Sequence, residues 1–199
     1  MPRLGQILPV LLLLCSCATN SPVPDNHYYK LPWQQGKLPA VSLSRGTIFV
    51  EQFITDGLYR ERPLLHTEDQ AGIDLRQYHY HYWVDAPARL LRDQLLLYLS
   101  ASHAAARLSA YPDATAELGI HGTVRGFEIR NHGNTRRVFV DLAFRVDRQG
   151  MESPLLLSDY QAQEDIQGPE MVDAVAAFEA ALSRIFASLV SDLREKLIN

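Results

Sequence analysis

The chain has 199 residues but only two cysteines. Both cysteines, Cys15 and Cys17, lie close to the start. The apolar segment before them, residues 7–14, is too short to cross a bilayer core, which takes about 20 apolar residues as a helix. If Cys15 is removed by processing and Cys17 is modified, no thiol remains for a disulfide or for thiol catalysis.

The sequence also lacks a basic excess, since its formal net charge is −4. Its arginines, such as Arg89, Arg92 and Arg107, alternate with acidic and apolar residues, as on an ordinary solvated helix face. A nucleic-acid partner is therefore not expected.

Motifs of catalysis are missing too. The chain contains neither a Gly-x-Ser-x-Gly elbow nor a His-Glu-x-x-His motif. Gly119, Gly122 and Gly126 are spaced only loosely like a phosphate-binding loop, and they lie within a strand pattern. We expect them to mark a bulge or a close approach of the backbone, and we expect no enzyme activity.

The amino terminus has the pattern of a secretory signal peptide, with Arg3 ahead of the apolar segment. Residues 14–17, Leu-Cys-Ser-Cys, resemble the bacterial lipobox, which predicts cleavage before Cys17 and removal of residues 1–16. Cys15 is an alternative site for the lipid. Cleavage before Cys15 would place Leu14 directly before the cut, and a leucine fits the small-residue cleavage pocket of the signal peptidase badly. The other alternative is an ordinary signal cut near Ala18, which would leave a soluble periplasmic protein.

Acylation of Cys17 would anchor the protein stably, because two or three acyl chains each contribute about 0.8 kcal/mol per buried methylene. In enteric bacteria an aspartate directly after the cysteine retains a lipoprotein in the inner membrane. This chain has Ala18 there, which predicts the periplasmic face of the outer membrane. Residues 17–27 are expected to form the lipidated cysteine and its tether, and residues 28–199 a single domain.

Hydrophobic periodicity predicts an α+β fold. We expect strands over residues 46–54, 64–68, 77–83, 118–124, 138–146 and 155–163, and helices over residues 85–108 and 169–195. The last helix carries an apolar residue every three or four positions over about six turns. The pattern predicts a two-layer sandwich, in which two long helices pack on one face of a mainly antiparallel meander sheet.

The strictest alternation lies in residues 77–83, Gln-Tyr-His-Tyr-His-Tyr-Trp. A period of two would place the three tyrosines on one face and His79, His81 and Trp83 on the other. The aromatic residues predict a partner or ligand interface, with the alternative that one face packs beneath a helix. The candidate interface residues are Tyr78, Tyr80, Tyr82 and Trp83.

The same strand offers weak candidates for a metal site. His79 and His81 would share a face, and His66 on a neighbouring strand could supply a third ligand for zinc. The alternative is a solvated face on which the two histidines only cover the sheet. We expect no metal and no cofactor apart from the lipid on Cys17.

Several marks together resemble the ABC-type transport auxiliary lipoprotein family, the PqiC-like proteins. They are Cys17, the segment Tyr28-Tyr29-Lys30-Leu31, and the segment Trp83-Val84-Asp85-Ala86-Pro87 between a predicted strand and helix. The resemblance implies a non-catalytic outer-membrane subunit of an intermembrane lipid transport system. Such a subunit would dock the transport conduit and support envelope integrity. Its partners would be a mammalian-cell-entry (MCE) domain protein and transporter subunits of the inner membrane.

Three alternatives stay open at this point. The domain could be a carrier for lipid or a small apolar ligand, with a pocket between helices and sheet. It could be an enzyme or a metalloprotein built on the histidine strand. An exposed sheet edge could also let copies of the chain associate into a homo-oligomer.

Overall fold

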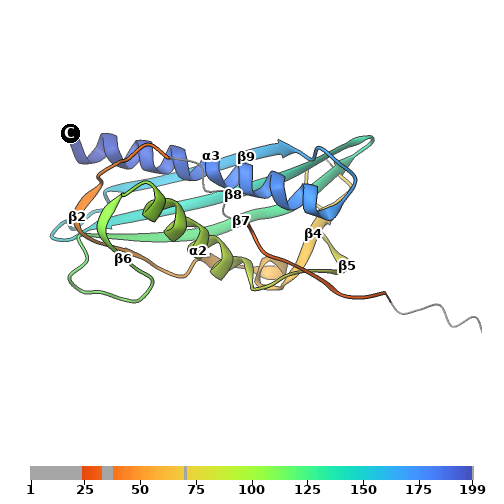
Figure 1. Cartoon of the computed structure of the whole chain (residues 1–199), viewed down its shortest axis with the longest axis horizontal. Coiled ribbons are helices and arrows are strands. Elements are labelled where there is room, and N and C mark those ends of the chain that lie inside the picture. Colours follow the sequence, from red (N-terminus) through yellow and green to blue (C-terminus); the bar gives the residue numbers. More distant parts are fainter. Residues whose placement is uncertain (1–23, 33–37, 70, 199) are drawn as a thin grey trace, which may run out of the picture.

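The computed structural model describes residues 24–32, 38–69 and 71–198 (Figure 1). The predicted signal peptide, Cys17 and the first part of the tether lie outside these residues. The described elements are β1 (His27–Tyr29), β2 (Ser44–Val50), β3 (Ile54–Thr55), the 3-10 helix η2 (Gly57–Arg60), β4 (Pro63–Thr67), β5 (Arg76–Trp83), α2 (Pro87–Ala101), β6 (Ala105–Ser109), β7 (Leu118–His132), β8 (Thr135–Arg148), β9 (Leu156–Asp165) and α3 (Met171–Ile198).

The described strands form one mixed sheet of nine strands around the long strand β7. One edge of β7 pairs with β8 along its whole length, and β8 pairs with β9, both antiparallel. The other edge pairs in succession with β2, β3 and β4, all parallel to β7. The predicted α+β class is confirmed. The predicted antiparallel meander holds only for β7–β9, because five of the eight described strand pairings are parallel.

Both helices lie on one face of the sheet, which curls along its length (Figure 1). The helices thus lie on one face as expected, but the sheet is curled and mixed, so the fold differs from the antiparallel two-layer sandwich that we predicted. α3 is long and apolar enough to cross a membrane by length and composition. More than half of its most apolar window is buried against the rest of the domain, as in a core helix of a soluble protein.

The core between helices and sheet is filled with aromatic side chains. Trp83 of β5, Phe127 of β7 and Phe178 of α3 are each buried, and their ring centroids lie 4.4 to 5.4 Å apart. The rings of Tyr98 on α2 and Phe186 on α3 meet edge to face at 5.7 Å. These contacts connect α3 to the sheet and α2 to α3.

The predicted helix over residues 85–108 ends earlier than expected, at Ala101. His103 has a positive φ of 52°, a conformation that stops a right-handed helix. The chain then forms β6, which pairs parallel to β2. The alanine-rich sequence of residues 101–106 favours a helix locally, but the hydrogen bonds to β2 outweigh that preference.

The short strands near the amino terminus also differ from the prediction. The expected strand over residues 46–54 divides into β2 and β3, and residues 51–53 between them belong to neither. β1 pairs with β5, although the segment up to residue 27 was expected to be tether.

The interpretation of the glycines in β7 is confirmed at two positions. A Cβ atom at Gly122 would lie 2.7 Å from the ring of Phe53, and one at Gly126 would lie 2.6 Å from the ring of Phe139. The register with β8 shifts between Val124 and Gly126, which marks a bulge there. Both glycines therefore allow an aromatic ring to lie directly on the backbone.

Candidate functional site

The aromatic strand β5 is irregular, because Tyr80 has a positive φ of 63°. Along β4 the partners advance from Pro63 to Leu65, while along β5 they move from Tyr82 to Gln77. Extra residues of β5 therefore bulge out of the ladder around Tyr80. A residue in this left-handed conformation interrupts the alternation of side chains that an extended strand would have.

The predicted division of the strand into a tyrosine face and a histidine face is therefore wrong. The ring of Tyr78 lies 4.3 Å from that of His66 and 6.0 Å from that of His81, so a tyrosine and a histidine share one side. Trp83, which was also expected at an interface, is 1% exposed and lies in the core. Tyr78 and Tyr82 are half-buried and Tyr80 is exposed.

The structure adds β1 to this strand, and the two share a cluster of rings. His27 stacks on His81 at 5.4 Å, and Tyr28 lies 5.7 Å from Tyr82. The Tyr29 hydroxyl makes a 2.8 Å hydrogen bond with Nδ1 of His81. Sequence reasoning missed this contribution, because a three-residue strand next to a tether has too little periodicity to be recognised.

The ring cluster is partly shielded from water. Burial lowers the pKa of His81, and the neighbouring His27 lowers it further. Burial also raises the pKa of Tyr29, and the carboxylate of Glu170 adds to that shift. Both shifts favour the neutral forms of His81 and Tyr29.

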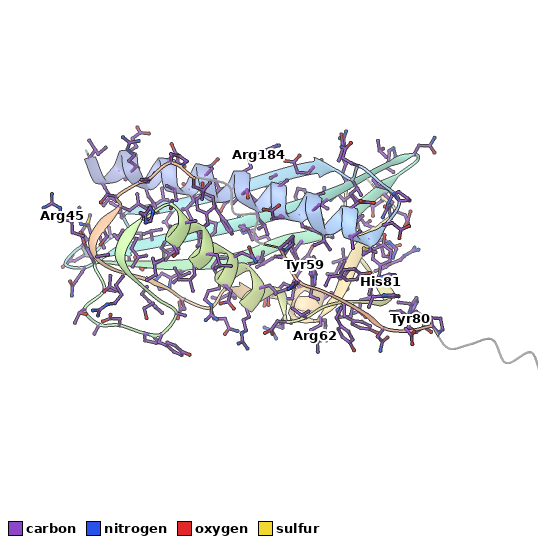
Figure 2. All side chains as sticks on the ribbon, viewed as in Figure 1. Arg45, Tyr59, Arg62, Tyr80, His81 and Arg184 are labelled. Atoms are coloured by element: carbon purple, nitrogen blue, oxygen red, sulfur yellow. The ribbon has the colours of Figure 1, made fainter. Side chains whose placement is uncertain are left out.

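One cation accompanies the cluster. The guanidinium of Arg62 lies 5.4 Å from the ring centroid of Tyr28, and its Nε donates to the carbonyl oxygen of Trp83 at 3.1 Å. Figure 2 shows Arg62, His81 and Tyr80 at the same end of the molecule, from which the amino-terminal segment departs. This end combines exposed rings with a positive charge.

The candidate metal ligands are not brought together. Nδ1 of His66 pairs with Oε1 of Glu68 at 3.1 Å, and the ring of His79 lies against Tyr80 at 6.3 Å. Among the described residues, no group of three His, Cys, Asp or Glu side chains is placed to hold a metal ion. This strand is better described as an aromatic surface than as a metal centre.

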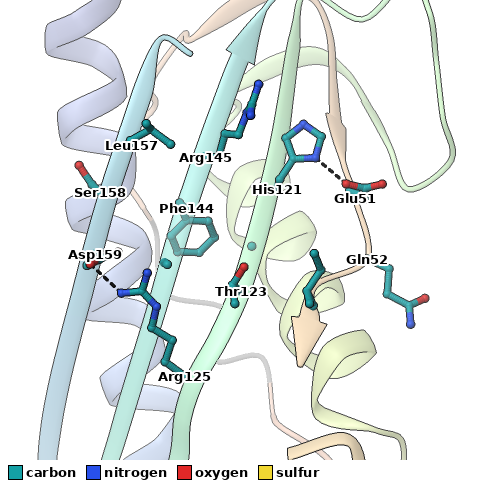
Figure 3. A pocket seen from close by; sticks show the side chains of 13 residues that line it. Glu51, Gln52, His121, Thr123, Arg125, Phe144, Arg145, Leu157, Ser158 and Asp159 are labelled. Atoms are coloured by element: carbon teal, nitrogen blue, oxygen red, sulfur yellow. Dashed lines mark hydrogen bonds and ion pairs between the residues drawn. The ribbon is translucent and has the colours of Figure 1, made fainter. Parts of the chain in front are cut away.

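A hollow of about 510 Å³ lies on the face of the sheet opposite the helices (Figure 3). Its charged groups are paired across strands: Arg125 donates to Asp159 at 2.7 Å, and Nδ1 of His121 lies 2.5 Å from Oε2 of Glu51. The apolar side chain of Leu157 is well exposed beside them. Sequence reasoning missed this hollow, because its residues come from four strands, β3, β7, β8 and β9, and from the loop after β2.

A buried carboxylate, also missed, lies in the second half of β7. Glu128 is 1% exposed, and it accepts hydrogen bonds from the Tyr59 hydroxyl at 3.0 Å and from Arg130 at 2.8 Å. Burial raises the pKa of Glu128, while Arg130 and Tyr59 partly counter that shift. The guanidinium of Arg130 also lies 3.4 Å from the ring centroid of Phe139. The charge is thus held by internal partners, as in a structural ion pair.

Comparison with solved structures shows the fold. A DUF330 protein from Xanthomonas campestris is 16% identical, with a TM-score of 0.72 over 82% of this chain and 92% of that one. An uncharacterized protein is 14% identical, with a TM-score of 0.68 over 84% and 98%. A hypothetical protein from Chlamydia trachomatis is 7% identical, with a TM-score of 0.53 over 77% and 98%. No curated protein matches the sequence.

The family comparison is more specific. Residues 61–190 match the family model described as the ABC-type transport auxiliary lipoprotein component. The match includes the aromatic strand, α2, all three long strands and α3 as far as Val190, and it spans more than half of the chain. This protein therefore belongs to the ABC-type transport auxiliary lipoprotein family.

Proposed function

We propose that this protein is a non-catalytic subunit of an intermembrane lipid transport system, anchored to the outer membrane by lipid on Cys17. On the periplasmic face it docks the end of a conduit built from MCE-domain proteins, and it thereby supports envelope integrity. The observation that carries the proposal is the family match over residues 61–190, because its description names both a transport system and a lipoprotein.

The position of the amino-terminal segment supports a tethered role. The described chain starts at Pro24, and this segment lies at one end of the long axis (Figure 1). A domain held at that end would present its long faces and its far end to the periplasm. Anchoring raises the local concentration of such a domain near its partner, so even weak docking becomes effective.

The packing of the core disfavours the alternative of a lipid carrier. The space between helices and sheet, where a pocket was expected, holds fully buried side chains that include Trp83, Phe127 and Phe186. The hollow lined by Arg125 and His121 lies on the other face, and its charged groups are ion-paired. An enclosed lipid would need an apolar cavity instead.

The anchor is tested by replacing each cysteine separately. We expect Cys17→Ala to release the protein into the soluble periplasmic fraction and to abolish its support of the envelope. Cys15→Ala is the matched control and should leave the protein in the membrane fraction. Mass spectrometry of the mature amino terminus should find an acylated Cys17. A Cys17→Ala protein that still fractionates with the membrane and still functions would contradict the proposal.

The outer-membrane location has its own test. Ala18→Asp places the inner-membrane retention signal directly after Cys17, so the variant should move to the inner membrane while remaining acylated. Separation of the two membranes on a density gradient measures this shift. An unchanged distribution would show that Ala18 does not direct sorting.

Docking to the conduit requires a partner. The full lipidated chain, solubilised in mild detergent, should co-purify with an MCE-domain protein from the same cells. Absence of any such complex from cells that contain both proteins would contradict this part of the proposal.

A further inference from the structure

We infer that the end of the domain from which the tether departs makes a second contact with the bilayer, in which exposed rings of β1 and β5 lie among the lipid headgroups. We call this surface the exit end and define it by His27, Tyr28, His79 and Tyr80. The inference rests on the proposed lipidation of Cys17 and adds a binding surface to it.

The pairing of β1 with β5 brings the exit end together. β1 runs parallel to β5 with His27 opposite His81, so the residues before His27 approach along the part of β5 that precedes His81. His79 and Tyr80 are the two residues directly before His81. Figure 2 shows Tyr80 beside the point where the amino-terminal segment departs.

The length of the tether keeps this surface close to the membrane. Seven residues, 18–24, lead from Cys17 up to and including Pro24, the first described residue. Fully extended, they span at most about 25 Å. With the acyl chains of Cys17 in the bilayer, Pro24 stays within that distance of the headgroups. His27, at the start of the exit end, follows only three residues later, so this surface meets the headgroups repeatedly.

The chemistry of the exit end suits the headgroup region of a bilayer. Tyr28 is 56% exposed and Tyr80 is 39% exposed. Tyrosine concentrates at membrane–water interfaces, because its ring is apolar and its hydroxyl hydrogen-bonds to water and headgroups. The Arg62 guanidinium over Tyr28 supplies a cation for lipid phosphates. Ile73, on the loop that leads into β5, is 85% exposed and adds apolar surface.

The backbone at Tyr80 is a second, independent observation. A φ of 63° is strained for a bulky side chain and unstrained for glycine. Because the Tyr80 ring is exposed, burial in the core does not offset the free-energy cost of that strain. Strain of this kind concentrates at sites that act on something outside the fold, which points to a role for the ring on the surface.

A fluorescence experiment on the full lipidated protein tests the inference. The mature chain would hold no thiol other than the acylated Cys17, so one introduced cysteine can be labelled uniquely. His79→Cys reports on the exit end. Tyr111→Cys is the control, because Tyr111 precedes the start of β7, whereas β4 and β5 lie beside the far end of that strand. The labelled proteins are placed in vesicles of phosphatidylethanolamine and phosphatidylglycerol that carry headgroup nitroxide quenchers.

We expect the label at position 79 to be quenched strongly and the label at position 111 weakly. The tether alone could cause part of that difference, so Tyr28→Ser and Tyr80→Gly are then combined in the His79→Cys protein. Tyr80→Gly relieves the backbone strain, which keeps the domain folded. The double variant should lose most of the quenching at position 79.

Quenching that is equal at both positions would overturn the inference, as would quenching at position 79 that the double variant leaves unchanged. A label at position 79 that is shielded only when the MCE-domain protein is added would assign the exit end to a protein partner instead. Flotation of the protein with vesicles measures the anchor separately, so failure of the ring contact is distinguishable from failure of lipidation.

Discussion

The strands β7, β8 and β9 are 15, 14 and 10 residues long, whereas β1, β3 and β4 on the other side of the sheet have 3, 2 and 5 residues. The long strands pair without interruption except for the bulge before Gly126. The short strands include the irregular pairing around Tyr80. The long strands and α3 supply most of the buried surface, which leaves the short strands free to present rings and charges at the surface.

The largest expected difference between the two regions is in the free energy of unfolding of variants in the core and at the exit end. Phe178→Ala removes a buried ring of α3 from contact with Trp83 and Phe127. We expect the free energy of unfolding to fall by about 3–5 kcal/mol, measured by urea denaturation. Tyr28→Ser at the exit end is the control and should change it by less than about 0.5 kcal/mol. Similar losses of unfolding free energy in both variants would contradict the view that the long strands and α3 stabilise the fold while the short strands serve the surface.

A smaller effect is expected where the backbone of β7 touches a ring. Gly122→Ala would place a Cβ atom 2.7 Å from the ring of Phe53, so the ring or the strand must shift. We expect a loss of about 1–3 kcal/mol in the free energy of unfolding. Gly46→Ala in β2 is the matched control, because its Cβ atom would lie 3.5 Å or more from its neighbours, at ordinary contact distance. Equal stability of the two variants would show that the ring at Gly122 moves away freely.

The smallest effect is a difference in pH dependence between two carboxylates. Burial raises the pKa of Glu128 in β7, so its contribution to stability is fully present below the unfolded value of about 4.3 and is lost as the pH rises through the folded pKa. Hydrogen bonds from the Asp74 N–H and the Thr67 hydroxyl lower the pKa of Asp69 in the β4–β5 loop. The contribution of Asp69 is therefore present above its unfolded value of about 3.9 and is lost as the pH falls through the folded pKa.

Unfolding in urea from pH 3 to 7.5 separates these contributions. As the pH falls from neutral, the wild type should gain stability relative to Glu128→Gln. It should lose its advantage over Asp69→Asn below the unfolded pKa of Asp69. Parallel curves for the wild type and both variants would show that neither carboxylate has a different pKa in the folded and unfolded states.

The amino-acid sequence by itself determined the regular half of the molecule. Val138, Val140 and Leu142 alternate without interruption, and the apolar stripe from Met171 to Leu193 has the period of a helix, so β8 and α3 follow from local pattern. Gly122 and Gly126 of β7 were also interpreted correctly, because a glycine within a strand often marks a bulge or a close approach of the backbone. The family resemblance rested on short motifs, and one of them, Trp83 to Pro87, joins β5 to α2.

Only the tertiary structure decided the other half. Parallel pairing of β2, β3 and β4 with β7 joins residues that are far apart in the chain. The local sequence pattern of a strand does not identify such distant partners. The same reason explains why residues 105–109 form a strand instead of continuing α2. The alternating rings of β5 suggested two clean faces, but the positive φ of Tyr80 placed Tyr78 beside His81 and turned Trp83 into the core. Backbone strain of this kind is imposed by packing around the strand, so side-chain periodicity alone does not reveal it.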